Sequence, residues 1–255
     1  MNKINTLLLI GLWLTVFACQ PPKPETKSTI STKHNFIVLL DLSDRLIVQP
    51  NQPERDKEII KEIYNIFEQQ VKENLYIRSR DEIKVVIAPQ RGAGLPTYMF
   101  EEELYINMEN IPKVMRRTKE EERRNYFFAY VDTLYDEAVF SSNPKEYHGA
   151  DIWKYIYEDL QQDMVSDTLT ENFLFVLTDG YPVVGKDTAK LEPVNKTFPD
   201  LEVILVEIAP REKDLEMDRI MELWQGWLNE MNVESYTFIK RRAISKEIDQ
   251  IKEII

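Results

Sequence analysis

Fully apolar runs alternate along this chain with segments that have a helical pattern. Residues 36–40 and 173–177 are apolar throughout, which is typical of parallel strands buried on both faces. After the first run, apolar side chains recur at three- and four-residue spacing over residues 53–71, which predicts an amphipathic helix. The alternation predicts a doubly wound, mostly parallel sheet with helices on both faces.

The same pattern predicts the other elements. Residues 83–88 are expected to form a second strand, followed by a turn at 92–96 and an extended segment at 97–108, which together predict an antiparallel edge hairpin. Thr118 and Glu121 form a capping-box signature for a helix that reaches residue 139. The remaining expected elements are helices over 150–164 and 214–231, strands over 201–208 and 235–239, a loop over 181–200 and a closing helix from 243.

Length and composition limit the organisation of the chain. It has 255 residues, of which 43% are apolar and 30% are charged, which suffices for one substantial core. We therefore expect one three-layer, Rossmann-like α/β domain over residues 35–255. The net charge of −12 argues against binding to nucleic acid or to an anionic lipid surface, because both require basic patches.

The first 18 residues have the pattern of a secretory signal, with a short positive region, an apolar stretch and a small residue, Ala18. The next residue, Cys19, is the single cysteine of the chain. The segment 16–19 resembles the lipobox of bacterial lipoproteins, which implies cleavage before Cys19 and acylation of its thiol, for example with palmitate. An ordinary cleaved signal with an incidental cysteine is the alternative.

Residues 19–34 are polar and rich in proline, so we expect a flexible tether between the lipid and the folded domain. Gln20, rather than an aspartate, follows the expected lipidated cysteine. By resemblance to bacterial sorting signals, this favours the outer membrane, on its periplasmic or its surface side.

Acidic turns follow two of the buried strands. Asp41 and Ser43 come directly after the first strand, and Asp179 lies in the Thr178-Asp179-Gly180 turn after residues 173–177. In open α/β sheets, ligands bind beyond the carboxyl ends of the strands. Acids from two strands can therefore meet there and share one cation.

These motifs, together with Gly149-Ala150-Asp151-Ile152 before an expected helix, resemble the von Willebrand factor type A (vWA) family. The resemblance implies a Rossmann-like sheet with a metal-ion-dependent adhesion site that binds magnesium and a carboxylate of a partner protein. The matching ligands would be Asp41, Ser43 and Asp179. The implied function is protein–protein binding in the cell envelope, with a partner that the sequence does not identify.

Two positions depart from the family pattern. Arg45 stands where a second serine would be, and Ala150 stands where a threonine would be. Asp44 and Asp151 could replace the missing ligands or bind a cation through water. Alternatively, the guanidinium of Arg45 could substitute for the cation and pair with Asp41 or Asp179 through two parallel hydrogen bonds. A third alternative is that the acidic segments are ordinary turns.

Evidence for catalysis is weak. The chain has only two histidines, His34 and His148, and Ser43 lacks the glycine-flanked turn of a nucleophilic serine. We therefore assign no catalytic residue and no organic cofactor. The best enzymatic alternative is a divalent-metal-dependent hydrolase or phosphotransfer enzyme that uses Asp41, Asp44, Asp151 and Asp179.

Overall fold

The computed structural model describes residues 31–91, 95–141, 149–182, 195–210 and 215–255. They belong to one unit, Ser31–Ile255. Several expected features lie outside the described residues: the signal segment, Cys19, most of the tether, the turn at 92–94, His148 and most of the 181–200 loop. In the part of the chain that is described, no helix is both long and apolar enough to span a bilayer.

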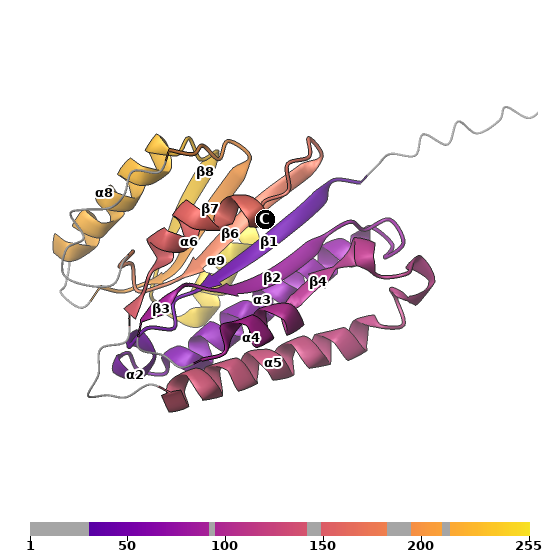
Figure 1. Ribbon diagram of the computed structural model, residues 1–255, viewed down its shortest axis with the longest axis horizontal. Helices are drawn as coiled ribbons and strands as arrows, with labels where there is room; N and C mark the ends of the chain where they lie inside the picture. The colour runs from indigo at the N-terminus through magenta and orange to yellow at the C-terminus, as the bar shows by residue number, and fades with distance from the viewer. Residues whose placement is uncertain (1–30, 92–94, 142–148, 183–194, 211–214) are drawn as a thin grey trace, which may run out of the picture. The chain divides into compact units, whose positions relative to one another are not determined.

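Within the described residues, six strands form one sheet in the order β4-β2-β1-β6-β7-β8 (Figure 1). All neighbours are parallel except β2 and β4, which pair antiparallel. This confirms the predicted α/β class with an antiparallel edge strand. The strands are β1 (Lys33–Leu40), β2 (Glu82–Ile87), β4 (Tyr105–Asn107), β6 (Thr170–Leu177), β7 (Leu201–Ile208) and β8 (Ser235–Lys240).

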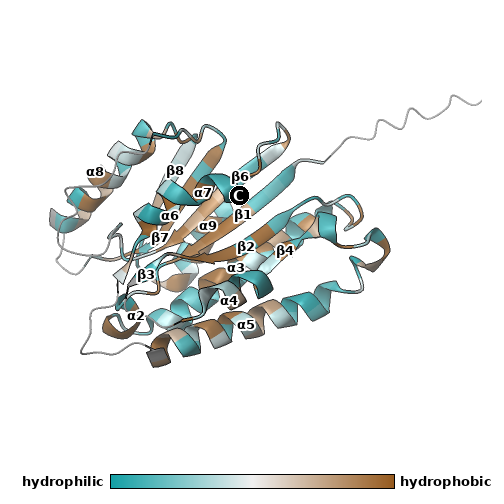
Figure 2. Cartoon of the chain, viewed as in Figure 1, coloured by the Kyte–Doolittle hydropathy of each residue, from teal (hydrophilic) through white to brown (hydrophobic). Residues whose placement is uncertain are grey.

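Helices cover both faces of this sheet. One apolar cluster joins Phe36, Val38 and Leu40 of β1 to one set of helices, and a second joins Ile37 and Leu39 to another set. The first set is α3 (Gln52–Glu73), α5 (Glu120–Ser141) and α9 (Ile244–Ile254); the second is α6 (Ile152–Glu158), α7 (Leu160–Asp163) and α8 (Leu215–Glu230). Because side chains alternate along a strand, a run that is apolar throughout supplies both layers. Figure 2 shows these central strands as the hydrophobic middle of the fold.

Three local predictions are wrong. The extended segment predicted at 97–108 begins as the helix α4 (Thr97–Glu103), which places Phe100 and Leu104 in the core one turn apart. Thr118 does not cap α5, because its hydroxyl donates a hydrogen bond to the carbonyl of Met115 (3.1 Å) and α5 begins at Glu120. The helix predicted over 150–164 is broken at Asp159, between α6 and α7.

Short elements complete the described part of the chain. Two of them, β3 and β5, form a small antiparallel pair beyond the end of β2. The short elements are α2 (Arg45–Val48), β3 (Gln90–Arg91), β5 (Gly149–Ala150) and the 3₁₀ turns Met108–Asn110 and Lys113–Met115. Of these, α2 follows the acidic turn after β1 and therefore lies at the carboxyl end of the sheet.

Candidate functional site

The acidic turns that follow β1 and β6 meet at the carboxyl end of the sheet. The backbone N–H of Asp41 donates to the carbonyl of Leu177 (3.1 Å). The hydroxyl of Thr178 donates to Oδ2 of Asp41 (2.9 Å), although the two residues are 137 positions apart. The expectation that these turns share one edge of the sheet is therefore confirmed.

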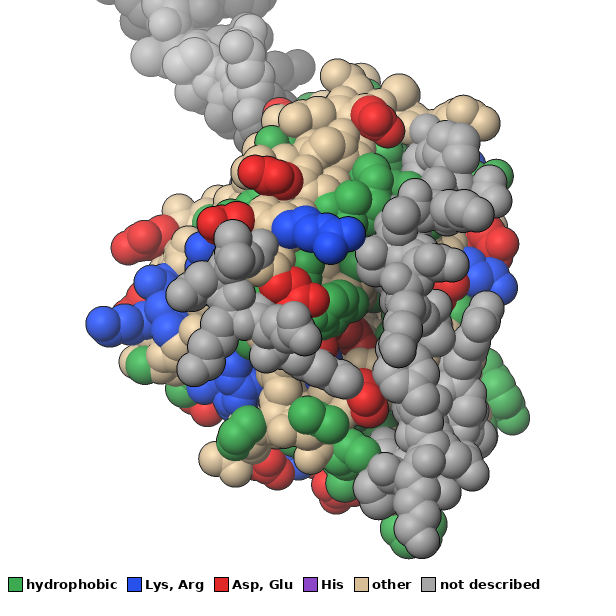
Figure 3. All heavy atoms as spheres, turned by 90° about the vertical axis from the view of Figure 1, so that its left-hand side faces the viewer, with side chains coloured by type: hydrophobic (Ala, Val, Ile, Leu, Met, Phe, Trp, Pro, Cys, Tyr) green, Lys and Arg blue, Asp and Glu red, His purple; other side chains and the backbone are tan. Residues whose placement is uncertain are grey.

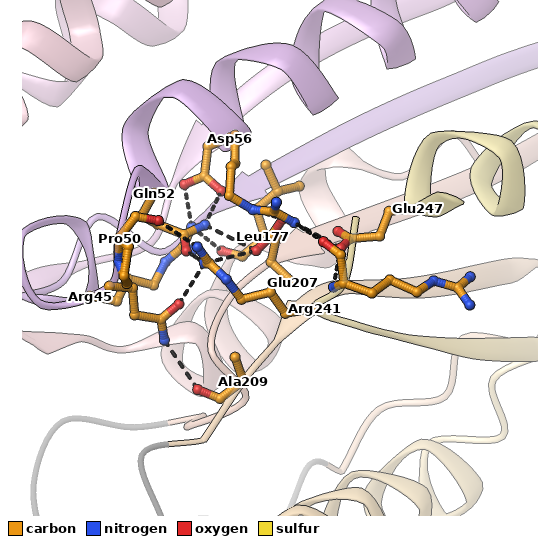
Figure 4. Close-up of polar contacts among 12 residues, drawn as sticks. Arg45, Pro50, Gln52, Asp56, Leu177, Glu207, Ala209, Arg241 and Glu247 are labelled. Atoms are coloured by element: carbon orange, nitrogen blue, oxygen red, sulfur yellow. Dashed lines mark hydrogen bonds and ion pairs between the residues drawn. The ribbon is translucent and has the colours of Figure 1, made fainter. Parts of the chain in front are cut away.

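Arg45 lies between these turns, and its side chain is inaccessible to solvent (Figure 4). Its Nε donates to the carbonyl of Asp41 (2.7 Å), and its Nη2 donates to the carbonyl of Leu177 (3.1 Å) and to Oδ2 of Asp56 (2.5 Å). Oδ2 of Asp41 is 3.8 Å from Nε. The guanidinium thus joins both turns to α3.

Arg45 donates a hydrogen bond to the carboxylate of Asp56, which the sequence analysis did not predict, and forms a longer ion pair with Asp41 in place of the suggested two parallel hydrogen bonds. Asp56 is fully buried and also accepts hydrogen bonds from the side-chain amide of Gln52 (2.8 Å) and the hydroxyl of Tyr135 (3.1 Å). Burial raises the pKa of Asp56 to about 6, and Arg45 opposes this rise. The sequence contained a signal, because Asp56 lies one turn before Ile60 on the apolar face of α3.

Burial alone would lower the pKa of Arg45, but the negative charges of Asp56, Asp41 and Asp179 raise it above the ordinary value. The arginine therefore stays positively charged inside the fold. A buried cation of this kind compensates the carboxylates around it, which would otherwise repel one another.

The other predicted ligands occupy the same edge in different ways. Ser43 is buried, and its N–H donates to Oδ1 of Asp41 (3.0 Å). Asp179 accepts a hydrogen bond from the N–H of Tyr181 (3.3 Å), and its charge acts on Arg45. The structure therefore places the charges of Asp41 and Asp179 near Arg45, and Ser43 against Asp41.

Asp44 and Asp151 begin short helices. Asp44 is the N-cap residue of α2, although its side chain makes no capping hydrogen bond there. Asp151 caps α6, because its Oδ1 accepts a hydrogen bond from the N–H of Lys154 (2.9 Å). The N–H of Asp151 donates to the carbonyl of Pro89 (2.8 Å), which fixes this cap beyond the end of β2.

The oxygen atoms at this edge of the sheet suit the guanidinium of Arg45 better than they suit a divalent cation. Both carboxylate oxygens of Asp41 already accept hydrogen bonds, and a buried positive charge lies 3.8 Å from one of them. A magnesium ion bound to Asp41 would face this like charge at close range. Across the described ranges, no three histidine, cysteine, aspartate or glutamate side chains are arranged to hold a metal ion.

A second set of buried charges adjoins Arg45, and the sequence analysis missed it. Glu207 is fully buried in β7, where the backbone bulges and takes a left-handed φ of 69°. Its Oε1 accepts from Nε of Arg55 (2.8 Å), and its Oε2 accepts from Nη1 of Arg241 (3.0 Å) and Nε2 of Gln52 (3.4 Å). Burial favours the protonated acid, but Arg55 and Arg241 hold the pKa of Glu207 below its ordinary value. The sequence did contain a signal for this buried charge, because Glu207 is a charged residue within the apolar run of β7.

Glu247 extends this network into α9. It is fully buried, its Oε1 accepts from Nη2 of Arg55 (2.8 Å), and its Oε2 has no hydrogen-bond partner. Burial and the adjacent negative charge of Glu207 raise the pKa of Glu247 to about 7. Glu247 can therefore hold a proton near neutral pH.

This raised pKa predicts the sign of a pH effect on stability. Glu247 has an ordinary pKa of 4.5 and a folded-state pKa of about 7, so the folded protein binds this proton more tightly than the unfolded chain. Between these two values, stability should fall as pH rises. We expect the melting midpoint to be higher at pH 5.5 than at pH 8, and this difference to shrink in Glu247→Gln. A wild-type midpoint that rises over the same range would contradict the assignment.

The short helix α2 presents apolar side chains beside the acidic turns. Ile47 is 37% exposed and Val48 is 56% exposed. Arg45 anchors the start of α2, while the side-chain amide of Gln49 donates to the carbonyl of Ala209 (3.1 Å) and Arg241 donates to Oε1 of Gln49 (2.8 Å). Figure 3 views the molecule from this end and shows apolar, acidic and basic side chains together on one face.

Comparisons with known proteins identify no family. No family model and no curated protein matches this chain. Among solved structures, it is similar to proximal thread matrix protein 1 from the mussel byssus, with 13% identity and a TM-score of 0.39 over 89% of this chain and 47% of that one, so the chain spans about half of the mussel protein. It is also similar to the conserved hypothetical protein BatB from Bacteroides thetaiotaomicron, with 15% identity and a TM-score of 0.36 over 88% of this chain and 100% of that one.

Proposed function

We propose that this chain is a lipid-anchored protein of the bacterial cell envelope whose vWA-like domain binds another protein at the carboxyl end of its sheet. The observation that carries the proposal is the rigid presentation of Ile47 and Val48 beside the acidic turns. Protein interfaces combine a small apolar centre with a polar rim. The partner is expected to offer an apolar pocket or side chain to Ile47 and Val48.

The contacts below α2 support a fixed binding surface. Arg45 and Arg241 each bind two or more groups from different elements, including backbone carbonyls of Asp41, Leu177 and Pro50. Such contacts hold the acidic turns and α2 in one arrangement before any partner arrives. A preformed surface loses less conformational entropy on binding.

Between the two alternatives for the cation, we propose that Arg45 replaces it. The guanidinium lies between the two turns, makes three hydrogen bonds there and offsets the charges of Asp41, Asp56 and Asp179. Magnesium bound by Asp41, Ser43 and Asp179 stays a prediction, as do Asp44 and Asp151 as substitute ligands.

Charge placed on the exposed apolar patch tests the binding proposal. When Val48→Asp is used for affinity capture from solubilised envelope, we expect the amount of the specifically retained protein to fall at least tenfold. The reason is that an apolar contact is replaced by a desolvated carboxylate. The amount retained by wild type and variant would be compared by quantitative mass spectrometry.

Val114→Asp provides a matched control, because Val114 is 89% exposed in a different part of the fold. This variant should retain the partner, and both variants should melt like wild type. Equal capture by Val48→Asp and wild type would refute binding at α2, and so would the absence of any protein that wild type retains specifically.

We also propose that Cys19 carries the lipid anchor and that Gln20 directs the protein to the outer membrane. Wild type should incorporate an alkyne analogue of palmitate and sediment with membranes. Cys19→Ser should do neither, because the acylated thiol is the expected anchor. Labelling that persists in Cys19→Ser would contradict lipidation at this position.

A further inference from the structure

Among the described residues, the last strand of the sheet, β8, has one edge with no strand beside it. In the strand order, β8 lies at the end, and β7 is the one described strand that pairs with it. The outer edge of β8 therefore carries backbone donors and acceptors that can pair with another strand.

The positions of these groups follow from the ladder with β7. The carbonyl of Val206 accepts from the N–H of Thr178 (3.1 Å), so Val206 faces β6, and the N–H of Arg241 donates to the carbonyl of Ile208 at the end of the ladder with β8 (3.0 Å). Peptide groups alternate in direction along a strand, so Ser235, Thr237 and Ile239, in step with Arg241, direct theirs to β7, whereas Tyr236, Phe238 and Lys240 direct theirs to the outer edge.

The features that usually prevent edge pairing are missing from this strand. Residues 235–239 contain no charge and no proline, and Tyr236, Thr237 and Phe238 are half-buried. Natural edge strands commonly carry a central lysine or a proline against association. Charges occur only at the two ends, where Glu234 and Lys240 are both exposed.

We infer that β8 pairs antiparallel with β8 of a second copy of this chain, about a two-fold axis at Thr237. Outward-directed residues must oppose one another in such a ladder, and centring it on Thr237 places Tyr236 opposite Phe238. In this register the two Tyr236–Phe238 pairs supply about four inter-chain hydrogen bonds.

Side chains and charges fit the same register. Glu234 of each copy lies opposite Lys240 of the other, so two oppositely charged pairs close the ladder. Tyr236 lies opposite Phe238, and facing aromatic side chains stabilise antiparallel strands. Within one chain, these rings already lie 5.6 Å apart, on the face of the sheet where Tyr236 contacts Asn229 of α8. The strand is therefore complementary to itself under two-fold symmetry.

Sedimentation of the full chain in detergent tests this inference. Wild type at tens of micromolar should have the protein mass of two chains. Tyr236→Pro should sediment at half that mass, because proline removes an N–H that points to the outer edge and not to β7. Cooperative thermal melting of the variant would show that the fold is retained.

A charge exchange adds a test that misfolding cannot imitate. Glu234→Lys should also halve the mass, because it places two lysines opposite each other at both ends of the ladder. Glu234→Lys combined with Lys240→Glu should restore the mass of two chains. Wild type that sediments as one chain, including the case in which β8 pairs with a different protein, overturns the inference. Two-chain particles that survive both single substitutions also overturn it.

Discussion

Replacing Arg45 with methionine should lower the free energy of unfolding by about 3–5 kcal/mol, because it leaves a buried carboxylate without its cation. Arg45 and Asp56 both have side chains that are inaccessible to solvent. The substitution also removes the donors for the carbonyls of Asp41 and Leu177. Urea unfolding monitored by circular dichroism would measure the loss.

A double-mutant cycle separates the charge effect from packing. Arg45→Met combined with Asp56→Leu should recover part of the stability, because a buried ion pair can be replaced by apolar side chains at small cost. The recovery should be incomplete, since the carbonyl of Asp41 loses the donor that Arg45 supplied and the carbonyl of Leu177 keeps only the N–H of Asp41. The deficit of Arg45→Met should also shrink at pH 5, where Asp56 can bind a proton. Additive single losses would contradict a direct Arg45–Asp56 pair.

The second large effect is expected at Trp224, which fixes the turn that carries Asp179. Trp224 is fully buried in α8, and its Nε1 donates to the carbonyl of Gly180 (2.9 Å). Gly180 has a φ of 111°, and an added Cβ would lie 3.0 Å from Ile220. Because Trp224 is fully buried, Trp224→Ala should lower the free energy of unfolding by about 3–5 kcal/mol through the cavity it leaves.

Trp224→Phe distinguishes the hydrogen bond from the packing. It keeps most of the ring but leaves the carbonyl of Gly180 without its donor, so we expect a loss of about 1–3 kcal/mol. Both variants would be compared in urea against wild type. If Trp224→Phe were as stable as wild type, the indole N–H would not be what holds the turn.

Strand positions were predictable because burial on both faces leaves a simple signal. The runs at 36–40 and 173–177 lie within β1 and β6, and the strand predicted at 201–208 coincides with β7. Local capping was harder to predict. Thr118 has the spacing of a capping box. It follows a 3₁₀ turn, however, and its hydroxyl donates to the carbonyl of Met115 at the end of that turn.

The acidic turns were predictable at the level of the sheet edge, and their internal contacts were not. Chain order and strand burial place Asp41 and Asp179 at the same edge, because the carboxyl ends of parallel strands lie together. The partner of Arg45 depends on the rotation of α3, which spacing alone does not fix. The burial of Glu207 depends on a bulge and a left-handed backbone conformation in β7, and no local sequence pattern predicts either of them.

The most direct test of the proposed site is thermal unfolding of wild type with saturating magnesium or manganese, compared with a chelator. If Arg45 takes the place of the cation, the melting midpoint should not change. A cation at one hundred times its dissociation constant would add ~2.7 kcal/mol of stability. A stabilisation of that size in wild type, lost in Asp41→Ala, would contradict the account and restore the metal-binding and metal-dependent enzyme alternatives.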